Sequence, residues 1–338
     1  MNFFLNGGIG YIGYHIAVQL LNAGHNVAFT ENDVSVIHSI KNKMDNKRIK
    51  TLRIYKGDIR DKGILRRVFG ENSIDCVIYF ADLNSTVESI NYPIKYYRNN
   101  LDAFLSLIEC MRGFSVKNLV FSSSANVYGD KCSMPCVESM IRGNCTNPYT
   151  WTLYMIEQMI EDTLKSYPAM SAVLLRCFNV AGFHERGLIG EYYNRSSNNL
   201  LSCISQVAAG KRDKLTVFGG DYDTPDGTCR RDYIHVMDLE NAHLKAVEYA
   251  VKHKGVEVFN IGTGTVYSVL EVIKTFEKVN GVKVDYEIGP RRSGDLPEVW
   301  ANVDKSAKVL GWRATRSLED MCRDAWKWQV KNPNGYEE

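Results

Sequence analysis

The feature that most constrains this chain is a glycine-rich turn joining a short apolar strand to an apolar helix. Residues 3–5 are Phe-Phe-Leu, residues 7–13 read Gly-Gly-Ile-Gly-Tyr-Ile-Gly, and residues 11–21 carry the helical pattern. A strand, a glycine turn and a helix start in this order predict a binding site for a diphosphate group.

Each glycine of the turn has a separate physical task in such a site. Gly7 permits the sharp turn, Gly10 lets the backbone approach the phosphates, and Gly13 lets the helix pack closely on the strand. The N–H groups at the helix start and the positive end of its dipole then face the anion.

A second part of the pattern follows at the expected distance. Residues 27–30, Val-Ala-Phe-Thr, read as the next strand, and Glu31 ends it. A carboxylate there accepts hydrogen bonds from the adenosine ribose hydroxyls and repels a 2′-phosphate. Residues 32–38 contain no Arg or Lys. We therefore predict NAD rather than NADP as the cofactor.

Composition excludes several classes of protein. The 338 residues can bury a large core, and the net charge of +2 gives no support for nucleic acid or an anionic membrane as a main partner. No apolar run approaches the length of a membrane span. The first residues lack a basic segment followed by an apolar core, so we expect a cytoplasmic protein.

The cysteines do not form a metal-binding pattern. There are nine, an odd number, and the closest pair is Cys132 and Cys136. Neither a second pair nor a histidine pair completes a zinc site, so we predict no metal. We therefore interpret the cysteines as free thiols in a reducing compartment.

Strand and helix patterns alternate through the first half of the chain. Short apolar runs at about 51–55, 75–81, 117–122 and 171–176 indicate buried strands, with helical patterns at about 93–113 and 149–166. This alternation predicts an α/β fold: a Rossmann-like, doubly wound parallel sheet. We expect an NAD-binding domain over residues 1–180, to which some later segments return, and a smaller mixed α/β region for the substrate over 181–338.

Several motifs in order resemble the extended short-chain dehydrogenase/reductase family, and within it the UDP-glucose 4-epimerases. Besides the glycine turn, the motifs are Gly-Asp-Ile-Arg at 57–60, Ser-Ser-Ser-Ala-Asn-Val-Tyr-Gly at 122–129, Arg-Asp-Tyr-Ile-His-Val-Met-Asp at 231–238 and Gly-Asp-Leu-Pro at 294–297. The resemblance runs nearly end to end.

The resemblance implies an isomerase of galactose metabolism that inverts carbon 4 of a UDP-linked hexose. NAD accepts and returns a hydride at that carbon, through a 4-keto sugar. Tyr149 then is the base for the 4-OH proton, and Ser124 holds the sugar hydroxyl and shares its proton. A free tyrosine has a pKa of about 10, so this value must be lowered for the residue to act as a base at neutral pH. The family supplies a lysine four residues later, on the same helix face.

This chain departs from the family at that position. Residue 153 is leucine, and no Lys or Arg occurs from Tyr149 to Thr163. Leucine carries no charge, so we expect strongly reduced turnover. Three further departures, Asn6, Asn84 and Cys177, put tight NAD retention in question.

The resemblance also implies a set of binding residues. Those expected to hold NAD are Gly7, Gly10, Tyr11, Ile12, Gly13, Glu31, Asn32, Asp58, Ile59, Phe80, Ala81, Asn99, Ser122, Tyr149 and Phe178. Those expected to hold the UDP-sugar are Ser124, Tyr149, Asn179, Asn199, Leu200, Phe218, Arg231, Arg292, Asp295 and Val299. Arginine suits a diphosphate because its planar fork binds phosphate oxygens in pairs.

Residue 299 is a gate on sugar size in the family. A tyrosine there narrows the pocket, and Val299 predicts room for UDP-GlcNAc and UDP-GalNAc as well as UDP-glucose and UDP-galactose. Members are often homodimers joined through helices that match 93–113 and 149–166. The first carries an apolar stripe, which ordinary core packing explains equally well.

Three alternatives to an epimerase follow from the same residues. One is a relative that binds NAD and UDP-sugar without useful turnover. Another is a nucleotide-sugar dehydratase, which needs an acidic pair where this chain has Ala125 and Asn126. The last is a simple dehydrogenase that releases NADH.

Overall fold

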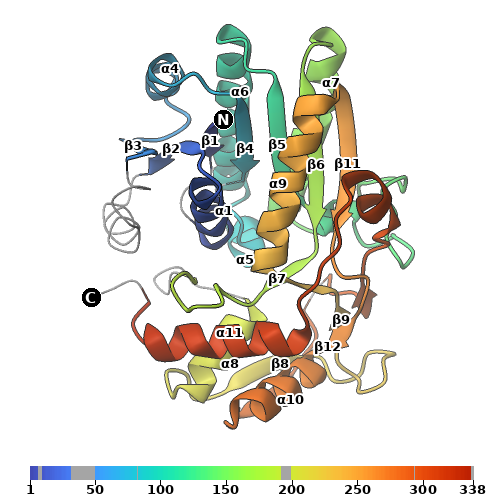
Figure 1. Ribbon diagram of the computed structural model, residues 1–338. Helices are drawn as coiled ribbons and strands as arrows, with labels where there is room; N and C mark the ends of the chain where they lie inside the picture. The colour runs from blue at the N-terminus through green and yellow to red at the C-terminus, as the bar shows by residue number, and fades with distance from the viewer. Residues whose placement is uncertain (7–9, 32–49, 82, 192–198, 293, 336–338) are drawn as a thin grey trace. The chain divides into compact units, whose positions relative to one another are not determined.

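The computed structural model describes residues 1–6, 10–31, 50–81, 83–191, 199–292 and 294–335 (Figure 1). Within these ranges the chain divides into two compact units. Unit 1 comprises residues 1–129, 141–176 and 242–259, and unit 2 comprises 130–140, 177–241 and 260–338.

Unit 1 is built on a seven-stranded parallel sheet in the order β11-β6-β5-β4-β1-β2-β3. Strand β1 pairs with β2 on one side and β4 on the other, with Phe4 opposite Ala28 and Val77. The strands, most of which lie visibly side by side in Figure 1, are β1 Asn2–Asn6, β2 Asn26–Glu31, β3 Leu52–Lys56, β4 Cys76–Phe80, β5 Asn118–Ser124, β6 Ser171–Cys177 and β11 Gly255–Ile261. The predicted doubly wound fold is confirmed.

Helices cover both faces of this sheet. One face buries Phe4, Tyr79 and Phe121 against apolar side chains of α4, α6 and α7. Helix α1 and the second half of α9 lie on the other face (Figure 1), where the rings of Phe80 and His243 are 5.7 Å apart. The helices are α1 Tyr11–Asn22, α4 Lys62–Glu71, α5 Thr86–Asn91, α6 Pro93–Gly113, the 3-10 helix η1 Ala125–Tyr128, α7 Pro148–Ser166 and α9 Val236–Lys252.

The apolar stripe predicted on α6 serves mainly the core of unit 1. Phe104, Ile108 and Met111 are buried in it, whereas Leu105 is 45% exposed. The periodicity therefore located the buried face of the helix, as expected for an amphipathic element.

Within the described ranges, unit 2 consists of short strands and helices, and the first turns of α9 also belong to it. Its strands form a pair β10-β7, a pair β13-β8 and a three-stranded sheet β12-β9-β14. The elements are β7 Asn179–Ala181, α8 Leu200–Ala208, β8 Leu215–Phe218, β9 Arg230–Arg231, β10 Tyr233–His235, β12 Tyr267–Ser268, α10 Val269–Asn280, β13 Tyr286–Gly289, β14 Glu298–Val299, the π-helix η2 Ser306–Leu310 and α11 Leu318–Lys331.

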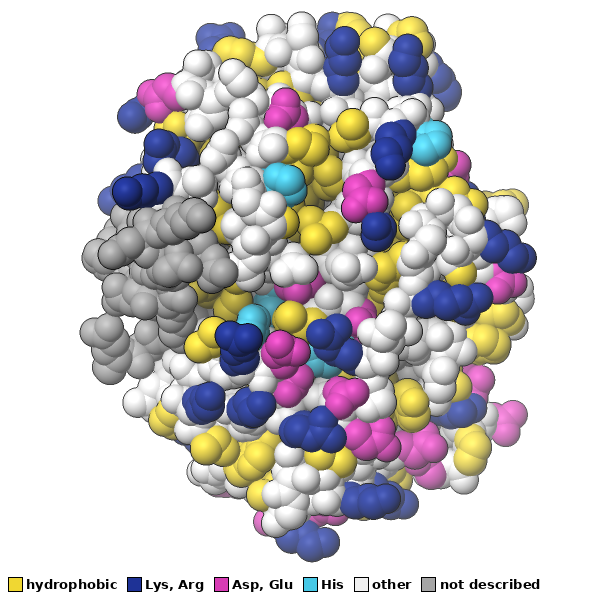
Figure 2. Space-filling model, in the orientation of Figure 1, with side chains coloured by type: hydrophobic (Ala, Val, Ile, Leu, Met, Phe, Trp, Pro, Cys, Tyr) yellow, Lys and Arg dark blue, Asp and Glu magenta, His cyan; other side chains and the backbone are white. Residues whose placement is uncertain are grey.

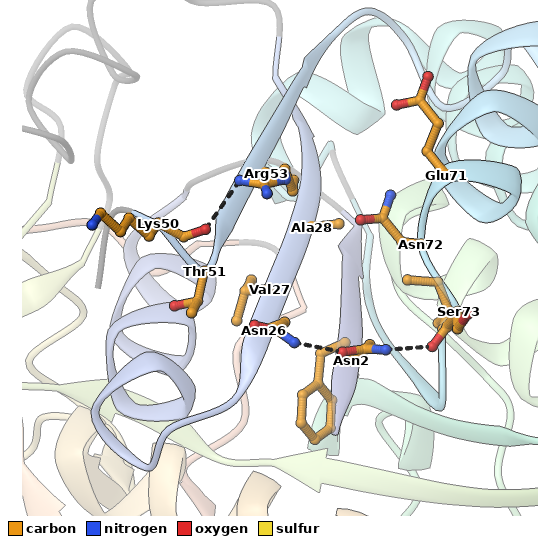
Figure 3. A pocket seen from close by; sticks show the side chains of 12 residues that line it. Asn2, Asn26, Val27, Ala28, Lys50, Thr51, Arg53, Glu71, Asn72 and Ser73 are labelled. Atoms are coloured by element: carbon orange, nitrogen blue, oxygen red, sulfur yellow. Dashed lines mark hydrogen bonds between the residues drawn. The ribbon is translucent and has the colours of Figure 1, made fainter. Parts of the chain in front are cut away.

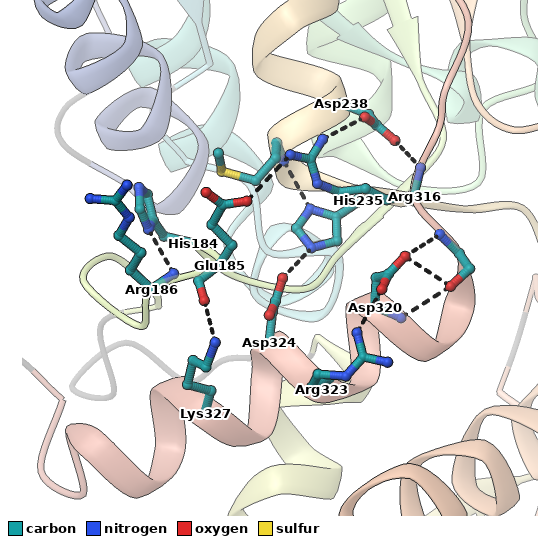
Figure 4. Close-up of polar contacts among 12 residues, drawn as sticks. His184, Glu185, Arg186, His235, Asp238, Arg316, Asp320, Arg323, Asp324 and Lys327 are labelled. Atoms are coloured by element: carbon teal, nitrogen blue, oxygen red, sulfur yellow. Dashed lines mark hydrogen bonds and ion pairs between the residues drawn. The ribbon is translucent and has the colours of Figure 1, made fainter.

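Buried polar contacts organise the packing of α11 in unit 2 (Figure 4). His235 Nε2 lies 3.2 Å from Asp324 Oδ2, and the His235 ring is fully buried. Asp238 accepts hydrogen bonds from the backbone N–H groups of Thr315 and Arg316 and from the Arg316 guanidinium. These bonds tie the segment that leads into α11 to the start of α9 within this unit.

A hollow of about 260 Å³ lies at the amino ends of β1, β2 and β3 (Figure 3). Its walls are held by their own hydrogen bonds, from Asn26 to Asn2 at 2.7 Å and from Asn2 to the Ser73 carbonyl at 2.8 Å. Ligands of such sheets bind beyond the carboxyl ends of the strands. This hollow is at the opposite edge and is not the candidate site.

Charged side chains of both signs are interspersed on the face shown in Figure 2. None of the helices in the described ranges has the length and apolar character needed to cross a lipid bilayer. The described side chains include no group of three or more His, Cys, Asp or Glu placed to bind a metal ion.

Glu240, in the first turns of α9, is 4% exposed in unit 2. Burial raises its pKa to about 8, with Glu185 and Asp238 adding to the effect and Arg316 opposing it. Since the unfolded chain releases this proton at a lower pH, the folded state binds more protons. Its stability must therefore fall as pH rises from the ordinary value of 4.5 toward about 8.

We predict that Glu240→Gln flattens this pH dependence and raises the free energy of unfolding near pH 8 by on the order of 3 kcal/mol. Urea unfolding between pH 5 and pH 8 measures it. The matched control is Glu248→Gln on the same helix, an exposed residue bonded to Lys245. An unchanged slope in Glu240→Gln would contradict the prediction.

Candidate active site

The carboxyl ends of the parallel strands in unit 1 collect the residues predicted to hold a dinucleotide. Gly10 caps the start of α1, whose first turn contains no acidic residue. A side-chain carbon built on Gly10 would meet no described atom within 4 Å. A helix start with glycine at the cap and no acidic residue in the first turn fits a diphosphate. Gly7 of the same motif lies outside the described residues.

The two adjoining strands end in buried polar side chains. Glu31 closes β2 and is 6% exposed, while Asn6 closes β1 and is 2% exposed. Among the described residues, Asn6 Nδ2 has no hydrogen-bond partner. Asn32, the next predicted residue, lies outside the described ranges. A buried carboxylate at this strand end fits the ribose contact that the sequence predicts.

Apart from Tyr149, the other predicted cofactor residues of unit 1 that the structure describes lie in or after strands of the sheet or in helices α1 and α6. Tyr11 and Ile12 are partly buried and Gly13 is buried in α1, Asp58 and Ile59 follow β3, Phe80 and Ala81 close β4, Asn99 lies in α6, and Ser122 lies in β5. The Asp58 carboxylate is held by the Arg60 guanidinium, which lowers its pKa. Asn84, one of the departures, is exposed in the loop after β4.

Ser124 and Tyr149 stand on neighbouring elements of unit 1. Ser124 ends β5 and its hydroxyl accepts a hydrogen bond from Asn126 N at 3.2 Å, capping η1. Tyr149 is in the first turn of α7, which Asn147 caps and Pro148 begins. Helix α7 packs against both β5 and η1. Both side chains are partly buried.

Further contacts fix the first turn of α7. Thr152 Oγ1 donates to the Tyr149 carbonyl at 2.6 Å and accepts from Asn100 Nδ2 at 3.0 Å. Asn100, in α6, also donates to the Leu83 carbonyl. This buried amide was not singled out from the sequence, where a lone asparagine in a helix gives no signal.

The loop between Ser124 and Tyr149 is closed by a glycine. Gly129 has φ +73°, and a side-chain carbon there would lie 1.8 Å from the Gly143 carbonyl oxygen. The Gly143 N–H donates to the Val127 carbonyl at 2.9 Å. Close backbone approach thus requires glycine at position 129.

Leu153 follows Tyr149 by one turn and belongs to the apolar core. It is 1% exposed and shares the core cluster with Ile156 and Ile160 of the same helix. Tyr149 packs at the edge of this cluster. Position 153 therefore contributes apolar packing and no charge.

One turn beyond Leu153 lies a buried ionic network that was not predicted. Glu157, fully buried, accepts from Ser123 Oγ at 2.6 Å and from Arg176 at 2.8 and 3.2 Å. The Arg176 guanidinium also lies 4.7 Å from the Tyr128 ring centre. Although burial opposes it, the Glu157 carboxylate raises the pKa of Arg176. The network anchors β5 to α7 beneath the serine run, and only the fold brings its members together.

In unit 2 the residues predicted to hold a diphosphate gather around Asp295. Arg292 Nε donates to Asp295 at 2.8 Å, and Arg231 lies 3.6 Å from the same carboxylate. The Arg292 guanidinium is 4.9 Å from the centre of the Phe218 ring, which is 39% exposed. Two cations and an accessible ring suit a nucleoside diphosphate.

Val299 lies beside this cluster because β14 pairs with β9, placing it opposite Arg231. Asp232, which follows Arg231 in the chain, is fully buried and accepts hydrogen bonds from the N–H groups of Thr263, Gly264 and Ala301. Burial raises the pKa of Asp232 even so. This carboxylate holds the strand that carries Arg231, a role that its motif alone did not reveal.

The remaining predicted residues of unit 2 lie on β7, before it and at the start of α8. Asn179 is exposed at the start of β7, and its N–H donates to the Asp232 carbonyl. Asn199 caps α8 and donates to the Val180 carbonyl at 3.1 Å, and Leu200 follows it. Phe178 and Cys177 are buried.

The family comparison decides which proteins share this arrangement. The NAD dependent epimerase/dehydratase family matches residues 4–262. This chain belongs to that family. UDP-glucose 4-epimerase from Haemophilus influenzae is 46% identical over 336 residues, covering 99% of each chain.

Solved structures of epimerases share the fold. The crystal structure of UDP-glucose 4-epimerase from Bifidobacterium longum, in complex with NAD+ and UDP, matches with a TM-score of 0.93 and 41% identity, covering 99% of this chain and 100% of that one. The UDP-Glc/GlcNAc 4-epimerase from Campylobacter jejuni matches with a TM-score of 0.82 and 32% identity, covering 98% of this chain and 99% of that one. The predicted family and its NAD cofactor are confirmed.

We predict that Glu157→Ala lowers the free energy of unfolding by about 3–5 kcal/mol, because it leaves Arg176 buried without its carboxylate. Urea unfolding followed by circular dichroism measures it. Glu161→Ala is the control on the same helix: Glu161 is more exposed and pairs with Arg142, so its loss should be smaller. Equal losses in the two variants would argue against a special role for the network.

Proposed function

We propose that this protein is a UDP-glucose 4-epimerase that interconverts UDP-galactose and UDP-glucose through a 4-keto intermediate, with strongly reduced turnover. The observation that carries the proposal is the Ser124 and Tyr149 pair at the carboxyl edge of the unit 1 sheet, in a chain 46% identical throughout to a UDP-glucose 4-epimerase.

We assign NAD to unit 1 and the UDP-sugar mainly to unit 2, close to the division at residue 180 that the sequence predicts. Bound NAD supplies reversible hydride transfer at carbon 4 of the sugar. The start of α1 at Gly10, with no acidic residue in its first turn, and the buried carboxylate of Glu31 support this assignment. We assign the other predicted cofactor residues, among them Phe178 of unit 2, to NAD on the family resemblance.

The reaction needs a group that holds and moves the proton of the 4-hydroxyl. We assign Tyr149 as the base and Ser124 as the residue that holds this hydroxyl and shares its proton. Tyr149 lies in the first turn of α7, where a helix favours negative charge. That position supports the assignment of Tyr149 as the base.

Reduced turnover follows from position 153. In the family a lysine there stabilises the tyrosinate, whereas Leu153 is uncharged and buried in the core. Two cations of the ionic network, the buried Arg176 and the partly buried Arg142, both pair with Glu157. We therefore assign neither arginine to the role of the lysine. Loss of a general-base contribution typically lowers the rate ~10²–10⁴-fold.

The burial of Leu153 also favours a second candidate: a protein that binds NAD and UDP-sugar without useful turnover. Interconversion of UDP-galactose and UDP-glucose at high enzyme concentration separates the two. The ultraviolet spectrum and nucleotide content of the purified protein test the binding that both candidates share.

For the substrate, we assign the diphosphate to Arg231 and Arg292, the uridine ribose to Asp295 and the uracil edge to Phe218. Their mutual contacts in unit 2 support this grouping. Asn179, Asn199 and Leu200 complete the proposed site toward the diphosphate and sugar. Val299 is smaller than the tyrosine that narrows the pocket in the family, so we include UDP-GlcNAc and UDP-GalNAc as substrates.

We also propose a cytoplasmic homodimer. Exposed apolar side chains cluster on α5 and at the start of α6: Ile90 is 57%, Tyr92 61% and Ile94 74% exposed. Apolar surface of this kind favours association. Light scattering tests the dimer.

We predict that Leu153→Lys raises kcat by ~10²–10⁴-fold and shifts the acid limb of the rate profile to lower pH, because an ammonium favours tyrosinate. The measurement is a coupled assay of UDP-galactose conversion from pH 6 to pH 9. Leu153→Met, similar in volume and uncharged, is the matched control and should leave the rate unchanged.

Two outcomes would count against this account of Leu153. The unaltered chain could turn over at a rate equal to that of Leu153→Lys, or Leu153→Lys could fold, bind NAD and gain no activity. Adding Tyr149→Phe to Leu153→Lys should abolish the gain, which confirms that the lysine acts through the phenol.

For sugar selectivity, we predict that isothermal titration detects binding of both UDP-glucose and UDP-GlcNAc. Val299→Tyr should weaken UDP-GlcNAc by roughly tenfold or more and spare UDP-glucose, because the added ring fills the space for the acetyl group. Rejection of UDP-GlcNAc by the unaltered chain would refute the assignment of residue 299.

A further inference from the structure

Two cysteines in unit 2 are placed for reaction with one another. All nine cysteines of the chain are thiols, and Cys132 Sγ lies 2.7 Å from Cys136 Sγ. A disulfide bond is about 2.05 Å long, so the sulfur atoms need only a small approach to bond. The pair lies in the segment 130–140, which belongs to unit 2 although its sequence neighbours on both sides belong to unit 1.

The two thiols differ in access. Cys136 is fully buried, whereas Cys132 is partly exposed. The Cys136 thiol beside it lowers the pKa of Cys132. An accessible sulfur with more thiolate character is the expected attacking group, and a buried neighbour is the expected resolving group.

The main chain holds Cys136 firmly. Its N–H donates to the Trp300 carbonyl at 2.9 Å, and its carbonyl accepts from Asn302 N at 2.9 Å and from Asn260 Nδ2 at 2.8 Å. Formation of the bond therefore requires movement of Cys132 and of the short loop before Cys136.

Most of the other cysteines lack these properties. Burial raises the pKa of the thiols of Cys110 to about 11, Cys145 to about 12 and Cys322 to about 12. It also raises those of Cys203 and Cys229. A raised pKa leaves little thiolate for exchange at neutral pH.

We propose that Cys132 and Cys136 form a reversible disulfide by exchange with a small-molecule disulfide such as oxidised glutathione. The Cys132 thiolate attacks one sulfur of the oxidant, whose S–S bond breaks and whose other sulfur leaves as a thiolate that takes a proton. Cys136 then loses its proton to solvent and attacks the Cys132 sulfur, releasing the second thiol. Two protein thiols are oxidised, and one disulfide is reduced to two thiols.

The disulfide closes a ring from Cys132 to Cys136 that is anchored next to β14. Trp300, a backbone partner of Cys136, directly follows Val299, and the other partner, Asn302, lies two residues further on. A link from the disulfide to the sugar pocket rests on the proposed function. The disulfide chemistry itself does not, because it needs neither NAD nor UDP-sugar.

The experiment treats the reduced full-length protein with oxidised glutathione at neutral pH, quenches with acid, alkylates the remaining thiols and maps peptides by mass spectrometry. We expect two fewer alkylated cysteines than the nine present, one peptide lighter by two hydrogen atoms with an internal Cys132–Cys136 bond, and full recovery with dithiothreitol. Cys132→Ser should abolish the bond, and Cys145→Ser, a control with a buried thiol, should retain it.

Three results would overturn the proposal: nine alkylated cysteines after oxidation, a glutathione adduct on Cys132 that Cys136 does not displace, or a bond between other cysteines. Cys136→Ser should also abolish the bond. Should this variant fail to fold, as judged by circular dichroism, Cys132→Ser still decides, because the Cys132 side chain is partly exposed. Loss of epimerase activity in these variants bears on the proposed function and not on the disulfide.

Discussion

Parallel pairing of β1 with strands on both sides is the constraint on which the candidate cofactor site of unit 1 depends. Because β2 and β4 run in the same direction as β1, and β5 runs parallel to β4, their carboxyl ends meet at one edge. That edge carries Asn6, Glu31, Phe80 and Ser124. One hydrogen-bonding pattern thus assembles side chains that are more than a hundred residues apart in sequence.

Helix α7 presents three different environments on one face. Tyr149, Leu153 and Glu157 follow at intervals of four residues, so they share that face. The tyrosine lies at the edge of the core, the leucine inside it, and the glutamate in a buried ion pair with Arg176. Burying a leucine stabilises a fold by about 1.5–3 kcal/mol, whereas an ammonium there needs a partner. The chain thus gains packing at the position where its relatives are expected to place a catalytic charge.

In unit 2 the candidate binding residues are positioned mainly by buried carboxylates. Its strands are too short to align residues by pairing alone, so a buried carboxylate does much of the positioning. Asp232 accepts hydrogen bonds from two separate segments of the unit, at residues 263–264 and at Ala301, and holds the strand that carries Arg231. Asp295 then sets the spacing of Arg231 and Arg292. Such networks form only where the folded chain brings their members together, so no local sequence pattern predicts them.

By itself, the amino-acid sequence determined the α/β class, the glycine turn at the start of α1, the strands of the first half, the helices over 11–21, 93–113 and 149–166, the family and NAD. These follow from short-range patterns, since periodicity and turn chemistry act over a few residues. Only the tertiary structure decided that segment 130–140 joins unit 2, that the stripe on α6 faces mainly the core, and that Ser123, Glu157 and Arg176 form one network. The physical reason is that burial and ion pairing depend on which distant segments pack together, and that is set by the whole fold.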